Sequence, residues 1–222
     1  MKYFNFPIEL LSGFFDQPIT DTFDKIISYS VYKISKDYSG TMDEKLNYAS
    51  SFFEAAYLTE SHIIDGERLF FSYPNSPMTG IATKMLVEFY IDDSKTEFEK
   101  VCLLAFLSFK SVLGTSKYTK SNFGLLFARM NGLNKPLPKK EFTPCKIISK
   151  YHTRRKSKKL RIELEDSWHL KYYAQDSRGF YFGLKINRED LVRLAVKSSK
   201  AYKLAERKKQ DEQIKRDLFG SL

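Results

Sequence analysis

Apolar positions in the first hundred residues repeat at helical spacing. Between residues 23 and 36 they fall at every third or fourth position, interrupted only by Ser30, which predicts a helix buried along one face. Asp21 or Thr22 stands at its start as the expected cap. Ahead of this helix, we expect residues 7–15 to form a short helix or an irregular anchor.

Local capping signals predict the next helix. Thr41 and Glu44 form a capping box, in which each side chain satisfies a free backbone amide. The helix should run to about Leu58, with Phe52 and Phe53 among its inward side chains. The pattern then predicts, in order, a shorter helix at 61–71, a loop at 72–80, and a helix rather than a strand at 81–91.

The most hydrophobic helix of the chain begins near residue 94. Ser94 and Glu97 fit a second capping box, and the side chains that follow are apolar nearly all round as far as Gly114. A helix that is apolar on every side belongs in the centre of a fold. After a turn, a helix at 120–130 should end at Gly132.

The segment 157–168 fits two interpretations. Leu160, Leu164 and Trp168 are spaced as on one face of a helix, which is the interpretation we favour. Leu160, Ile162 and Leu164 also alternate, as they would in a strand.

A β-hairpin and a long helix complete the pattern. Aromatic-rich runs at 170–174 and 180–186 flank the turn-forming residues 175–179, which predicts the hairpin. Asn187 should cap a charged helix that extends from residue 188 to about 217.

These elements predict a mainly α protein with a small β-hairpin. We divide it into an acidic helical region at 1–93, a basic region at 94–186 and a long charged C-terminal helix at 187–222. Within 94–186 the order is helix, turn, helix, loop, basic helix and aromatic hairpin, which is the order of a winged helix-turn-helix. We expect this winged-helix-like half to pack on the N-terminal helical region.

The distribution of charge points to a partner. The net charge of the chain is +10. Residues 1–100 hold 9 Lys and Arg against 16 Asp and Glu, whereas residues 101–222 hold 28 against 11. Such asymmetry is typical of a basic half that binds nucleic acid or an acidic surface. A solvated basic surface that only maintains solubility is the plainer alternative.

Seven cations crowd into the twelve residues 150–161, and phosphates would relieve their mutual repulsion. Further cations lie near the second helix of the basic region and along the hairpin. The candidate nucleic-acid-binding residues are Lys117, Lys120, Lys150, Arg154, Arg155, Lys156, Lys158, Lys159, Arg161, Lys171 and Arg178.

Catalytic interpretations are weaker. His152 and Arg155 spell the HxxR of tyrosine recombinases, but Tyr172 and Tyr173 follow too closely for that family. Acidic side chains at 163–166 could bind Mg²⁺, although on a helix they more simply balance nearby cations. Cys145, His152 and His169 lack the close paired spacing of a metal site. The aromatic side chains of the hairpin fit core packing better than stacking on unpaired bases.

Other features limit the setting of the protein. No window approaches the length of a membrane span, and the N-terminal segment does not resemble a signal peptide. Two cysteines exclude a disulfide framework and favour the reducing cytoplasm. We expect no cofactor, metal or membrane.

Four segments carry a resemblance. The runs KYFNFPIELLSGFF, FEKVCLLAFLSFKSVLG, LLFARMNG and KYYAQDSRGFYFGLKI resemble a family of uncharacterised Bacteroidetes proteins that are often associated with mobile elements. The resemblance implies a phage, plasmid or transposon setting. It implies no site residues, because the family has no established activity.

The sequence therefore predicts a non-catalytic nucleic-acid-binding protein, with DNA favoured over RNA. It would act as a regulator, a replication accessory or a component of a mobile-element complex. The alternative is an adaptor whose basic face binds an acidic protein. Self-association through the N-terminal region or the C-terminal helix would fit either role.

Overall fold

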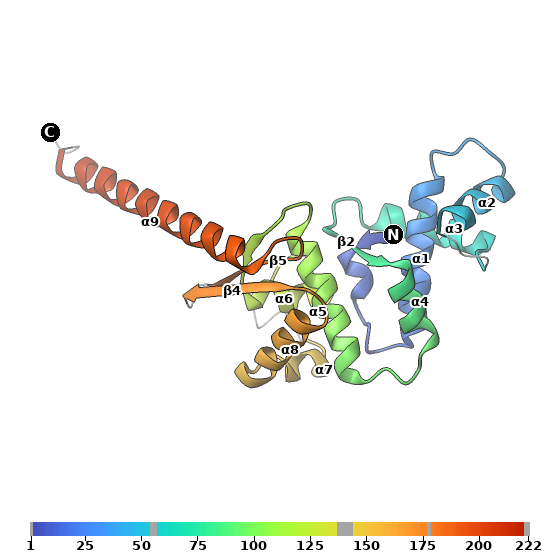
Figure 1. Ribbon diagram of the computed structural model, residues 1–222. Helices are drawn as coiled ribbons and strands as arrows, with labels where there is room; N and C mark the ends of the chain where they lie inside the picture. The colour runs from blue at the N-terminus through green and yellow to red at the C-terminus, as the bar shows by residue number, and fades with distance from the viewer. Residues whose placement is uncertain (1, 54–56, 137–143, 177–178, 220–222) are drawn as a thin grey trace.

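The computed structural model describes the chain except residues 1, 54–56, 137–143, 177–178 and 220–222. The fold is mainly helical, with two small antiparallel sheets. Figure 1 shows an N-terminal group of helices, a C-terminal group around the second sheet, and a central helix between them.

A two-stranded sheet begins the fold. Strand β1 (Tyr3–Pro7) pairs antiparallel with β2 (Met78–Ala82), and a short 3-10 helix, η1 (Ile8–Leu11), follows β1. The predicted loop at 72–80 and helix at 81–91 are therefore wrong over residues 78–82. The predicted anchor at 7–15 missed the strand before it. Both errors have one cause, since each strand is stabilised by a partner far away in the chain.

Four helices complete the N-terminal region: α1 (Ile19–Ser35), which packs on β1, α2 (Met42–Phe53), α3 (Glu60–Ser72), which packs on α1, and α4 (Thr83–Ile91), which follows β2. Helices α1 and α3 pack closely because Gly66 of α3 has no side chain. A Cβ there would lie 2.1 Å from the Ser28 carbonyl oxygen.

The expected capping of these helices is partly confirmed. The capping box of Thr41 and Glu44 is present. Helix α1 begins earlier than predicted, after Pro18, so neither Asp21 nor Thr22 caps it. Phe53 is buried as expected, but Phe52 is exposed, because the two side chains diverge by about 100° around the helix.

Helix α5 (Glu97–Leu113) forms the centre of the molecule, as its apolar surface predicts. Its capping box is formed by Thr96 and Glu99, two residues after the predicted pair. Ser94 instead donates a hydrogen bond to Asp92. The helix ends at Gly114, which has a positive φ of 57°.

The C-terminal group follows in chain order: β3 (Thr119–Ser121), α6 (Phe123–Met130), α7 (Lys146–Lys150), α8 (Arg154–Asp166), β4 (Lys171–Asp176) and β5 (Gly179–Gly183). Strands β4 and β5 form the expected hairpin. The unexpected β3 pairs with β5 on its other side, so the strand order is β3-β5-β4. The helical interpretation of 157–168 is correct, and α8 begins three residues earlier.

Backbone hydrogen bonds close α6 at Gly132, as predicted. The Gly132 amide donates to the Arg129 carbonyl at 3.0 Å, and the Leu133 amide donates to the Ala128 carbonyl at 2.9 Å. With a φ of 73° at Gly132, this is a Schellman motif.

The last element is α9 (Arg188–Phe219), which projects away from the molecule (Figure 1). The Asn187 side chain accepts a hydrogen bond from the Asp190 amide at 2.7 Å, so the predicted cap is present. Its first turns pack on the sheet, where Leu191 and Ala195 contact Tyr181.

One hydrophobic cluster extends from Phe4 in β1 to Phe182 in β5. Helix α5 joins its two ends. The Thr79 hydroxyl in β2 donates to the Leu107 carbonyl of α5 at 2.7 Å, and Phe109 of α5 packs against Phe182 at 4.7 Å between ring centroids. The regions before and after residue 93 therefore share one core.

Candidate nucleic-acid interface

Helix α8 holds the densest cluster of cations and is fixed by two buried leucines. Leu160 and Leu164, four residues apart, point into the hydrophobic cluster. Since side chains on a helix advance by 100° per residue, these two leucines determine which residues face away from the protein.

The outward face of α8 includes Arg155, Lys158 and Ile162, at spacings of three and seven residues. All three are exposed, and Ile162 exposes 43% of its surface. No hydrogen bond or ion pair occupies the side chain of Arg155 or Lys158 among the described residues. The face is therefore basic over its N-terminal turns, carries one exposed apolar side chain at Ile162, and ends at the exposed carboxylate of Asp166.

The first turn of α8 concentrates positive charge unfavourably. Arg154, Arg155 and Lys156 occupy it, no acidic residue lies there, and the Thr153 side chain does not cap it. A helix N-terminus already carries partial positive charge and unpaired amides. This end of α8 is consequently a region that an anion would stabilise.

Two further cations of α8 rest on aromatic rings. The Lys159 ammonium lies 4.4 Å from the Phe98 ring centroid, and the Lys156 ammonium lies 5.6 Å from that of Tyr151. Both side chains remain exposed, Lys159 beside the outward face and Lys156 in the first turn, on the side of Leu160.

Lys150 and Arg161 have partners within the protein. Lys150 pairs with Glu97 at 3.1 Å, which reduces the positive charge available at the surface. Arg161 is half-buried, lies over the Tyr172 ring at 4.6 Å and is 3.8 Å from Glu165. Arg161 thus braces α8 against β4 and does not join the exposed face.

The sheet separates the hairpin cations from α8. Phe180, Phe182 and Tyr172 pack into the main core, whereas Tyr181 packs against α9 on the opposite face. The Lys120 ammonium lies over the Tyr181 ring at 5.6 Å, so Lys120 belongs to the α9 face. By strand alternation, Lys171 shares the face of Tyr173, which also packs beside α9.

The last two of the predicted nucleic-acid-binding residues, Lys117 and Arg178, are not part of the basic surface that the structure describes on α8. Lys117 is exposed in the turn before β3. Arg178 lies outside the described residues. The structure therefore gathers Arg154, Arg155, Lys156, Lys158 and Lys159 on the exposed part of α8, and distributes the other candidates elsewhere.

The residues considered for catalysis do not form a cluster. His152 packs edge-on against Phe127 at 4.7 Å between ring centroids, and Tyr172 is half-buried under Arg161. Burial raises the pKa of Tyr172. Within the described ranges, no group of three or more His, Cys, Asp or Glu side chains is arranged to hold a metal ion.

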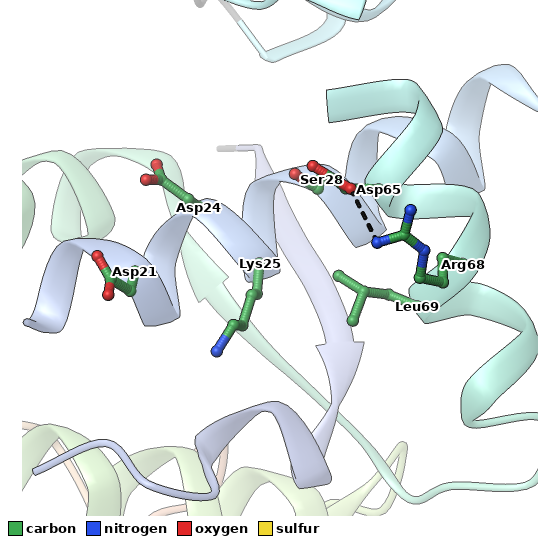
Figure 2. Close-up of a pocket in the computed structure, with 7 residues that line it drawn as sticks. All are labelled: Asp21, Asp24, Lys25, Ser28, Asp65, Arg68 and Leu69. Atoms are coloured by element: carbon green, nitrogen blue, oxygen red, sulfur yellow. Dashed lines mark ion pairs between the residues drawn. The ribbon is translucent and has the colours of Figure 1, made fainter. Parts of the chain in front are cut away.

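A hollow lined by both acidic and basic side chains lies on the N-terminal helices. Its volume is about 440 Å³, and its carboxylates come from Asp21, Asp24 and Asp65. Figure 2 shows these carboxylates at separate points along α1 and α3, with Asp65 paired to Arg68. That pair is 3.5 Å apart, and Tyr90 donates to Asp24 at 3.2 Å. The carboxylates are thus dispersed and partly occupied by protein donors.

Two features of the surface were not found from the sequence. One is the outward position of Ile162, which the spacing of Leu160 and Leu164 could have indicated. The other is a cavity beside Lys110, which joins residues from both ends of the chain and has no local signal.

No protein family, curated protein or solved structure matches the chain. In the part of the chain that the structure describes, no helix is long and apolar enough to span a membrane. Function must therefore be argued from the site itself.

Proposed function

We propose that the protein binds duplex DNA by placing α8 in the major groove, without catalysing a reaction. The observation that carries the proposal is the exposed basic face of α8, where Arg155 and Lys158 project beside an uncapped, cation-rich first turn. Phosphates would supply the missing negative charge and release counterions.

The chain topology supports a winged-helix arrangement. The order is α5, β3, α6, α8, β4 and β5 with short α7 before α8, and the sheet order is β3-β5-β4. In such a fold the helix before the hairpin enters the groove, and the hairpin lies alongside it. Helix α8 holds that place in the chain.

The side chains of α8 favour DNA over duplex RNA. The major groove of B-DNA admits an α-helix, whereas that of A-form RNA is too narrow for side chains to read. Arg154 and Arg155 are suited to phosphates, and Ile162 is suited to the methyl group of thymine. These roles fit a regulator, a replication accessory or a mobile-element component.

The test compares two triple variants of equal charge in a salt series with labelled duplex DNA. One carries Arg155→Ala, Lys158→Ala and Lys159→Ala, and the matched control replaces three lysines of the N-terminal region, Lys25, Lys45 and Lys84, by Ala. We expect the α8 variant to bind more than about tenfold more weakly, and its salt slope to fall by about 2 to 3. The control should retain the wild-type slope.

Equal weakening by both triple variants would assign the effect to net charge alone and contradict the proposal. Binding of single-stranded DNA or RNA in preference to the duplex would also contradict it. Tight binding lost only in the α8 variant would support α8 as the interface.

A second candidate is self-association through the N-terminal region. Ile64 and Phe71, seven residues apart on α3, expose 51% and 68% of their surfaces. Exposed apolar side chains on one helix face are typical of interaction surfaces. Sedimentation velocity of the wild type and of Phe71→Ser tests self-association there: an oligomer that dissociates in the variant supports this candidate, and a monomeric wild type removes it.

A further inference from the structure

An open cavity of about 380 Å³ lies where the two halves of the molecule meet. Tyr3, Ala82 and Met85 line it from the N-terminal region, Phe106 and Lys110 from α5, and Trp168 and Leu184 from the C-terminal region. Its volume is within the range of small-molecule sites, which are concave, mostly apolar and equipped with a few polar groups.

Lys110 is the polar group set most deeply in this apolar wall. Its ammonium donates a hydrogen bond to the Gly80 carbonyl of β2. The same ammonium lies 4.6 Å from the Tyr3 ring centroid and 5.6 Å from that of Phe106. Gly80 and Asn5 are a non-hydrogen-bonded pair of the antiparallel β1–β2 ladder. Their amides and carbonyls point away from the partner strand, so the Gly80 carbonyl is free to accept a hydrogen bond from Lys110.

The charges around the cavity leave Lys110 without an anion. Burial, reinforced by the nearby charge of Lys185, lowers the pKa of Lys110 to about 8. Lys84 and Lys185 add two exposed cations at the rim. The only lining carboxylate in the described part of the chain is that of Glu88, which is held by Lys95 at 2.6 Å.

We propose that this cavity binds a small molecule with an apolar body and a single carboxylate, which pairs with Lys110. The apolar body packs against Met85, Phe106 and Trp168. An ammonium carries three donors, and Gly80 accepts from one, so a carboxylate has donors available to it. The rim lysines attract such an anion, and a cationic ligand is disfavoured.

Ion pairing fits Lys110 better than covalent chemistry. With a pKa of about 8, Lys110 is protonated in most molecules at neutral pH. Nucleophilic attack on a carbonyl needs the free amine instead. The proposal is independent of whether α8 binds nucleic acid, since no residue of α8 contributes to the cavity.

Trp168 provides the measurement, because it is the single tryptophan of the chain and lines the cavity. Its indole packs 5.0 Å from the Phe106 ring centroid, so an occupant alters its surroundings. The full-length protein is titrated with octanoate, 1-octanol and octylamine, which share one tail and differ in charge. We expect a saturable fluorescence change with octanoate, and binding of the alcohol and the amine that is at least about tenfold weaker.

Two variants then localise the site. Lys110→Met keeps a long apolar stem without the charge and should lose the preference for octanoate over 1-octanol. Lys100→Met removes a charge from the same helix away from the cavity and should retain that preference. If Lys110→Met does not fold, the affinities of the wild-type protein for octanoate, 1-octanol and octylamine test the proposal without the variant.

Three results would overturn the proposal. They are the absence of saturable octanoate binding, equal affinity for octanoate and 1-octanol, and an unchanged octanoate preference in a folded Lys110→Met protein.

Discussion

At the scale of single residues, the molecule uses its long cations in two ways. Arg161 and Lys110 are turned inward, over the rings of Tyr172 and of Tyr3 and Phe106, and hold elements together. Arg155 and Lys158 face solvent without a protein partner among the described residues. Residue type alone does not separate these groups, because the stem of Lys or Arg packs on apolar surface as readily as its charge meets water.

The lowered pKa of Lys110 makes stability depend on pH. The folded protein releases this proton near pH 8, whereas the unfolded chain keeps it to about its ordinary value of 10.5. Between these values the unfolded state binds more protons, so the Lys110 contribution to the free energy of unfolding rises with pH. The free energy of unfolding by urea is measured across this pH range for the wild type and for Lys110→Met. The wild-type value should rise relative to that of the variant as the pH increases.

The comparison with Lys110→Met removes the contribution of tyrosines and other lysines that titrate in the same range. A difference that stays constant with pH would contradict the assignment to Lys110.

Replacement of Gly66 by a larger residue tests the close packing of α1 and α3. Replacement by Ala should favour the helical conformation of α3, but the new Cβ meets the Ser28 backbone oxygen. We expect a net loss of about 2 kcal/mol in the free energy of unfolding by urea. In Gly124→Ala the nearest atom is the Asn122 side-chain oxygen at 3.2 Å, so this control should change stability far less. Equal effects would indicate that α1 and α3 separate easily.

At the scale of elements, capping and burial decide where each helix begins and which side it presents. Helix α5 begins at a reciprocal box of Thr96 and Glu99, in which the Glu99 amide donates to the Thr96 hydroxyl at 3.2 Å. Helix α8 has no such cap and begins with three cations. The contrast is consistent with the proposed roles of a structural centre and an anion-binding surface.

Removing the cap of α5 should destabilise the protein measurably. Thr96→Ala leaves the Glu99 amide without its acceptor, and we expect a loss of about 1 kcal/mol in the free energy of unfolding. Ser94→Ala is the matched control, because the Ser94 hydroxyl donates to Asp92 outside the box. A larger loss of stability in Ser94→Ala than in Thr96→Ala would instead support the capping box of Ser94 and Glu97 that the sequence predicts.

At the scale of the whole molecule, the acidic and basic halves are joined by one hydrophobic cluster with α5 at its centre. The cavity beside Lys110 and the basic face of α8 both depend on this arrangement. Helix α9 extends beyond it, with its first turns packed on the face of the sheet opposite the main core.

A shared core should unfold as one unit. Fluorescence of Trp168 reports on the junction of the two halves, whereas far-UV circular dichroism reports on all helices. We expect the two signals to change together during urea unfolding, because the packing of α5 couples the halves. Two transitions that do not coincide would show that part of the helical structure unfolds separately from the junction of the halves.

Local signals were sufficient for much of the fold. The box of Thr41 and Glu44, the closure of α6 at Gly132 and the Asn187 cap each depend on residues within one turn. The helical class of the protein and the hairpin follow from short-range periodicity, which acts over a few residues. The density of cations in 150–161 is likewise a property of the sequence.

The tertiary structure decided what depends on partners distant in the chain. Strand β2 forms because β1 lies beside it, across more than seventy residues, and neither segment alone has enough strand preference to show this. Among the cations, the sequence determined how many there are. Packing determined that Arg161 and Lys110 turn inward while Arg155 and Lys158 face solvent, because burial is set by the neighbours that the fold brings together.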